Sequence, residues 1–193
     1  LAFDEEEFPL AIAYEIRHTV MDRTEIFEVT LSAAMRVCVP LSKERIRKIL
    51  VPIMERLCKE PEQFGVLRSE AIEMLRVQVF QSKHPTQNLS YGQAAKIVDY
   101  VLKYLVHPHG FPEVIRKRLD PVLHPVIDSP ILNNYRVGLG LQAESLAQLG
   151  QEEHKRMEEK LIAEAEEEGL TVAEYDDELW ERFSGPRKET PND

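Results

Sequence analysis

The stretch SYGQAAKIVDYVLKYLV, residues 90–106, decides the fold class. Ser90 and Gln93 have the spacing of a capping box, in which two side chains satisfy the free backbone N–H groups at a helix start. The apolar residues that follow recur every three or four positions, as on one face of an α-helix: Ala94, Ile97, Val98, Val101, Leu102 and Leu105. This stretch predicts a half-buried helix.

The same helical spacing extends to both sides of this stretch. The chain has 12 prolines and 8 glycines but no Asn-Gly or Asp-Gly hairpin turn, so strands are not expected. Prolines recur every 10–20 residues, which favours an all-α fold, an irregular or orthogonal bundle of short helices. Pro52 should kink or split its helix. The other expected helices cover about 8–20, 23–37, 43–60, 67–82 and 112–119, with a further one capped by Asp128 or Ser129.

The composition changes near residue 141. A long charged helix with a narrow apolar stripe is expected from there to Gly169, a natural helix-ending residue. Thr171 and Glu174 form a second capping box before a last helix. We therefore expect a helical core domain at 1–140, and a charged helical hairpin at 141–183 that packs on the core or on a partner. A disordered tail is expected at 184–193.

The negative charge lies in the C-terminal part. The net charge is −10, and residues 141–193, with 16 acids and 6 bases, carry all of it. Residues 81–140 have 7 bases and 4 acids and are mildly basic. The net negative charge of the chain does not support a nucleic-acid partner. The excess of bases in residues 81–140 keeps such a partner possible.

Several classes of protein are excluded or disfavoured. The sequence has no phosphate-binding glycine loop, GxSxG, HExxH or CxxC motif, so enzymes built on those motifs are excluded. No apolar run is long enough for a membrane span, and the first residues are acidic rather than basic, so a cytoplasmic protein is expected. Cys38 and Cys58 are expected to be reduced thiols. No cofactor is predicted.

One pair of residues could carry chemistry. Lys96 lies on an otherwise apolar helix, where partial desolvation would make its amine a better nucleophile. Asp128 lies at an expected helix start, where the helix dipole favours the carboxylate form. The structural alternative is that Lys96 extends to the surface and Asp128 is an ordinary N-cap.

The runs SYGQAAKIVDYVLKYL and HPVIDSPILNNY, with the later LTVAEYDDELW, resemble helix-hairpin-helix base-excision DNA glycosylases. This resemblance implies that Lys96 is the Schiff-base nucleophile and Asp128 the activating carboxylate. The hairpin here has one glycine, Gly92, where the family has two, and Asp128 follows 32 residues after Lys96, a longer spacing than the family's. The resemblance also implies DNA as a partner, with phosphate contacts from Lys103, Arg116, Lys117 and Arg118. The same runs are similar to a helical prokaryotic family, which implies no function.

Two other patterns in the sequence could carry a function. His107, His109 and His124, with Asp120 and Asp128 nearby, could bind a metal, or could be ordinary loop residues. Arg118 and His124 resemble the arginine–histidine pattern of HEPN-type ribonucleases at these two positions only.

Three classes of function therefore stay open. They are a nucleic-acid-acting protein with glycosylase-like architecture, a non-catalytic interaction or regulatory protein that binds through its C-terminal helices, and a HEPN-like ribonuclease.

Overall fold

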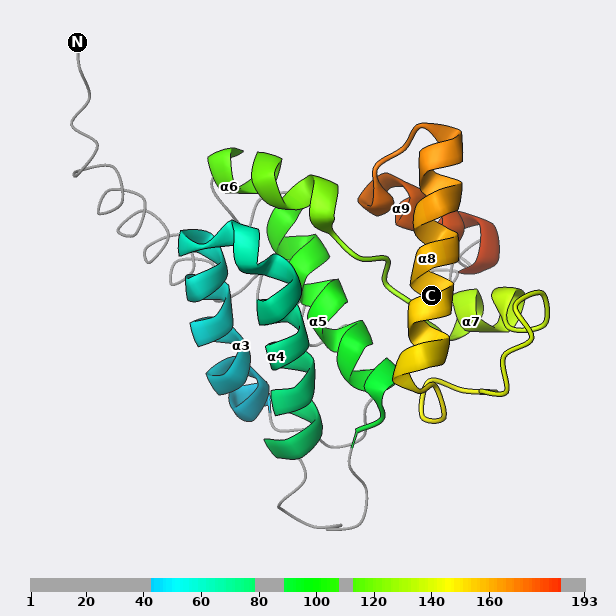
Figure 1. The fold of residues 1–193 in the computed structure, drawn as a ribbon, viewed down its shortest axis with the longest axis horizontal. Helices are drawn as coiled ribbons and strands as arrows, with labels where there is room; N and C mark the ends of the chain where they lie inside the picture. Colours follow the sequence, from blue (N-terminus) through cyan, green and yellow to red (C-terminus); the bar gives the residue numbers. More distant parts are fainter. Residues whose placement is uncertain (1–42, 79–88, 108–112, 185–193) are drawn as a thin grey trace, which may run out of the picture.

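The computed structural model describes residues 43–78, 89–107 and 113–184, and within these ranges it contains helices and no strand. The expected all-α fold of short helices is therefore confirmed (Figure 1). The helices are α3 (Lys43–Lys59), α4 (Phe64–Gln78), α5 (Tyr91–Val106), α6 (Glu113–Leu119), α7 (Ser129–Tyr135), α8 (Gln151–Glu168) and α9 (Val172–Ser184), with 3-10 turns η2 (Pro61–Gln63) and η3 (Asp120–Val122).

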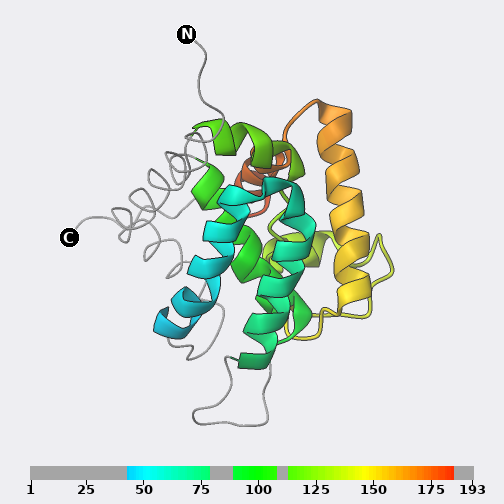
Figure 2. The ribbon, with the colours of Figure 1, turned by 60° about the vertical axis from the view of Figure 1, so that its left-hand side comes forward.

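The first group of helices packs around α5. Helices α3, α4 and α5 lie side by side, and α6 lies across one end of them (Figures 1 and 2). Their apolar stripes form one cluster of buried side chains, as the periodicity of α5 predicted. Its fully buried members include Ile46, Leu50, Leu67, Ile97 and Leu102.

The second group consists of α7, α8 and α9. Their buried side chains form a separate apolar cluster, which includes Ile127, Leu132, Met157, Leu161 and Leu179. Helix α7 ends before residue 140, so the two charged C-terminal helices share this core with part of the segment expected to be the core domain. The boundary at 140 stays a prediction.

The capping box at the start of α5 is confirmed, and it also joins the two groups. Ser90 Oγ accepts the Gln93 N–H at 3.2 Å, and Gln93 Oε1 accepts the Ser90 N–H at 3.1 Å. The Gly92 N–H donates to the Leu149 carbonyl at 3.0 Å. A Cβ at Gly92 would lie 2.8 Å from Leu149 Cβ, so only glycine allows this close approach.

Other helix boundaries differ in part from expectation. Helix α3 continues through Pro52 and is not split there. The long charged helix begins at Gln151 rather than near 141, because residues 141–150 form turns that place Leu146 and Leu149 in the second core. The Gly169 C-cap, at φ 72°, and the Thr171–Glu174 capping box are confirmed. The expected helices at 8–20 and 23–37, and the tail after Ser184, lie outside the described residues.

Candidate functional site

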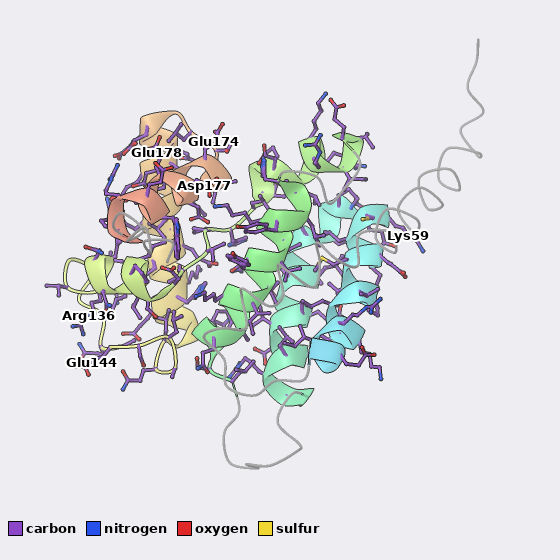
Figure 3. All side chains as sticks on the ribbon, turned by 180° about the vertical axis from the view of Figure 1, so that it is seen from behind. Lys59, Arg136, Glu144, Glu174, Asp177 and Glu178 are labelled. Atoms are coloured by element: carbon purple, nitrogen blue, oxygen red, sulfur yellow. The ribbon has the colours of Figure 1, made fainter. Side chains whose placement is uncertain are left out.

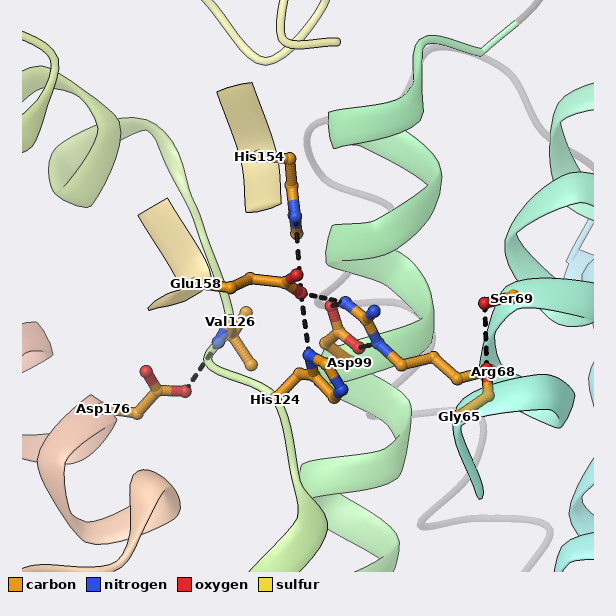
Figure 4. A network of polar contacts seen from close by, with 9 residues as sticks. All are labelled: Gly65, Arg68, Ser69, Asp99, His124, Val126, His154, Glu158 and Asp176. Carbon is orange, nitrogen blue, oxygen red and sulfur yellow. Dashed lines mark hydrogen bonds and ion pairs between the residues drawn. The ribbon is translucent and has the colours of Figure 1, made fainter. Parts of the chain in front are cut away.

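The most unusual group of polar side chains lies where the two groups of helices meet. It comprises Arg68 on α4, Asp99 on α5, His124 in the segment before α7, and His154 and Glu158 on α8; we call it the Arg68 cluster (Figure 4). Four of the five residues are buried, and His124 is partly exposed. Buried charges are costly unless they are paired, so the contacts within the cluster decide its state.

Arg68 is the central cation. Its Nε donates to Asp99 Oδ1 at 2.6 Å and one terminal nitrogen donates to Asp99 Oδ2 at 2.7 Å, a bidentate pair. The same terminal nitrogen donates to Glu158 Oε1. Burial would lower the pKa of Arg68, but the charge and hydrogen bonds of Asp99 and the charge of Glu158 raise it overall. Arg68 is therefore a permanent cation between two carboxylates.

Glu158 connects Arg68 to both histidines. His124 Nδ1 lies 3.0 Å from Glu158 Oε1, and the His124 ring stacks on Phe64. Burial would raise the pKa of Glu158, but its contacts with His124 and His154 and the charge of Arg68 hold it well below its usual range. Glu158 is thus ionised at neutral pH.

His154 is the member of the cluster whose side chain lacks hydrogen bonds to the described residues. Its side chain is 0% exposed, and its Nδ1 lies 3.4 Å from Glu158 Oε1, one helical turn away. That contact is close enough for electrostatic attraction but lies outside hydrogen-bonding geometry. Neither ring nitrogen has a hydrogen-bond partner among the described residues. The Tyr91 ring lies edge-on to the His154 ring, with the two ring centroids 5.2 Å apart.

The structure brings the predicted pair Lys96 and Asp128 into electrostatic contact. Asp128 is the N-cap of α7 and accepts the Ile131 N–H at 3.2 Å, so the predicted cap is confirmed. Burial raises the pKa of Asp128, while the Ile131 N–H and the charge of Lys96 lower it in part. Lys96 is 9% exposed and Asp128 is 5% exposed, so the described residues leave little access to either group.

Most of the predicted phosphate-binding residues contact carboxylates. Lys103 Nζ lies 2.8 Å from Asp177 Oδ1. Lys117 pairs with Glu113 at 2.7 Å, within α6, and Arg118 lies 3.7 Å from Glu62. Arg116 is partly buried. Carboxylates of the same chain therefore neutralise the charges of Lys103, Lys117 and Arg118. These three residues do not form a basic surface without nearby acids.

The predicted histidine cluster is not assembled by the described residues. His107 Nε2 contacts Asp120 Oδ1 at 2.6 Å, whereas His124 contacts Glu158. His109 lies outside the described residues. Arg118 and His124, the two positions of the HEPN-like pattern, likewise face different carboxylates, Glu62 and Glu158.

Asp176 on α9 is another buried carboxyl group at the junction. Its Oδ2 accepts the Val126 N–H at 2.9 Å and lies 3.5 Å from Lys103 Nζ. Burial raises the pKa of Asp176 to about 7, although the Lys103 charge acts in the opposite direction.

Sequence reasoning missed the Arg68 cluster, although two signals were present. His154 and Glu158 are four residues apart, which places them on one face of a helix. Arg68 and Asp99 are charges on helices whose inner faces are otherwise apolar. The pairing itself could not be found, because Arg68 and Glu158 are 90 positions apart.

Comparisons with other proteins add no family. No protein-family model, curated protein or solved structure matches the chain. Among the described residues, every helix is too short or too polar to cross a membrane.

Proposed function

We propose that this protein is a non-catalytic helical interaction module whose acidic C-terminal helices bind a basic protein partner. The observation that carries the proposal is the placement of exposed carboxylates at the end of α8 and along α9. Glu166, Glu167 and Glu168 are all exposed in the last turn of α8. Figure 3 shows Glu174, Asp177 and Glu178 along α9.

The carboxylates at the end of α8 destabilise the folded state. The C-terminal end of a helix carries partial negative charge, so each acid there costs about 0.3–1 kcal/mol. The last turn of α8 contains three glutamates and no basic residue. A partner that supplies lysine or arginine side chains would relieve this repulsion, which explains why the arrangement is useful despite its cost.

An exposed aromatic side chain lies on α9, close in sequence to the acids of that helix. Trp180 is 52% exposed and follows Asp177 by three residues on α9. Tryptophan contributes strongly to protein–protein interfaces, because it buries a large area with little loss of side-chain entropy. Acidic groups around an exposed tryptophan favour a partner with both a basic and an apolar contact surface.

The test uses charge removal and compares stability with binding. Glu166→Gln/Glu167→Gln/Glu168→Gln should raise the thermal midpoint, because it removes repulsion at the helix end, and should reduce recovery of salt-sensitive basic partners in quantitative affinity capture. Glu152→Gln, an exposed acid in the first turn of α8, is the matched control and should leave capture unchanged. Equal capture by the triple variant and the parent protein would refute the proposal.

A second candidate is a nucleic-acid-acting protein with glycosylase-like architecture, and the electrostatic contact between Lys96 and Asp128 favours it. In this mechanism the Lys96 amine attacks C1′ of a flipped nucleotide and displaces the damaged base, and opening of the sugar ring then gives an imine. Borohydride should then reduce the imine to a stable adduct with DNA that contains damaged bases. Lys96→Gln should abolish the adduct. If the parent protein gives no adduct, this candidate fails and the interaction module remains.

A further inference from the structure

His154 has an unmet chemical requirement. A fully buried imidazole without a hydrogen bond destabilises the fold, because it has lost its contacts with water. A proton donor, a proton or a metal ion could satisfy a ring nitrogen. The groups beside it are carboxylates, which accept hydrogen bonds and also bind cations.

The donor atoms around His154 have the separations of a metal site. One donor atom from each of Asp99, His154 and Glu158 lies within 4.8 Å of the other two, and all three residues are buried. Donors around a tetrahedral zinc ion lie about 3.3–3.5 Å apart, because each is about 2.0–2.1 Å from the metal. The His154 and Glu158 donors are 3.4 Å apart, which fits this geometry, and His124 contacts Glu158 from the outside at 3.0 Å.

We propose that Asp99, His154 and Glu158 bind a divalent transition-metal ion of the Zn²⁺ class, and that His124 holds the ligand Glu158 in position through its Nδ1. One imidazole and two carboxylates are a donor set that suits zinc and leaves a fourth position for water. The ligands come from α5 and α8, so the ion would join the two groups of helices. This proposal is independent of the acidic binding surface on α8 and α9.

Arg68 then acts as an outer partner of the ligands. Each carboxylate oxygen has two lone pairs, so the Arg68–Asp99 pair can persist while another lone pair binds the ion. Hydrogen-bonded partners of this kind fix metal-binding carboxylates in position. With neutral histidines the cluster carries a net charge of −1 without the ion and +1 with it, so neither state is favoured by charge alone. Ligand geometry therefore decides the affinity.

The experiment titrates chelator-treated protein with Zn²⁺ by calorimetry, and with Co²⁺ by the visible absorption of tetrahedral coordination. We expect one Zn²⁺ per chain, a Kd below about 10 µM and a higher thermal midpoint with the ion. His154→Gln should weaken Zn²⁺ binding at least tenfold. His124→Ala, at the partly exposed edge, should do so as well, and it keeps the test decisive if His154→Gln does not fold.

The matched control is His107→Gln, which changes another histidine–carboxylate contact, the one with Asp120, in a partly exposed position. It should leave Zn²⁺ binding unchanged. Absence of binding below about 10 µM would overturn the proposal. So would equal weakening by His107→Gln and the cluster variants, since that result would show weak binding by scattered surface groups.

Discussion

Replacing Arg68 with methionine should destabilise the protein strongly. The substitution keeps an unbranched apolar chain but removes the cation between Asp99 and Glu158. The Arg68 and Asp99 side chains are 5% and 1% exposed, so solvent screens the remaining charges poorly. Removal of one partner from a buried ion pair costs about 3–5 kcal/mol, because an uncompensated charge is left behind. Urea unfolding, followed by circular dichroism, measures this change in the free energy of unfolding.

The surface pair between Arg56 and Glu70 supplies the matched control. It also has two short hydrogen bonds, at 2.8 Å each, but its side chains are 46% and 38% exposed. Arg56→Met should therefore cost less than about 1 kcal/mol. Adding Asp99→Asn to Arg68→Met should recover part of the loss, since it removes one of the two stranded charges. Equal costs for the two arginine variants, or no recovery in the double variant, would refute the reasoning.

Three further predictions concern the junction of the two groups of helices. The pKa of Asp176 is raised from 3.8 to about 7, so its stabilising contribution is complete below pH 3.8 and is lost as the pH rises through about 7. Asp176→Asn should therefore raise stability by roughly 2–4 kcal/mol at pH 8 in urea titrations, and the gain should shrink towards pH 4; a gain that does not depend on pH would contradict this. Gly92→Ala should lower the free energy of unfolding by about 1–3 kcal/mol in the same assay, because the added Cβ would overlap Leu149. Gly65 has open space around it, so Gly65→Ala should be neutral or stabilising. Ser90→Ala should lower stability by about 1 kcal/mol through loss of the cap, and an unchanged thermal midpoint would argue against that role.

Local patterns predicted the helices well, and contacts between distant segments were not predictable. The capping boxes at Ser90 and Thr171 were correct because each depends on residues three positions apart. The start of the charged helix was wrong by about ten residues, because Leu146 and Leu149 fit a helical stripe equally well when they pack from a turn. The charge of Lys96 acts on Asp128, but the burial of both residues depends on packing that no local pattern encodes, and their catalytic role stays a prediction.

The 90-residue separation of Arg68 and Glu158 has a consequence for synthesis of the chain. At about 5–20 residues per second, the ribosome would add Arg68 roughly 5–18 seconds before it adds Glu158. During that interval Arg68 can pair with Asp99, which follows after 31 residues, so the nascent first group of helices is not left with an unpaired cation. Arrival of α8 then completes the cluster, because the docked second group of helices places Glu158 beside Arg68.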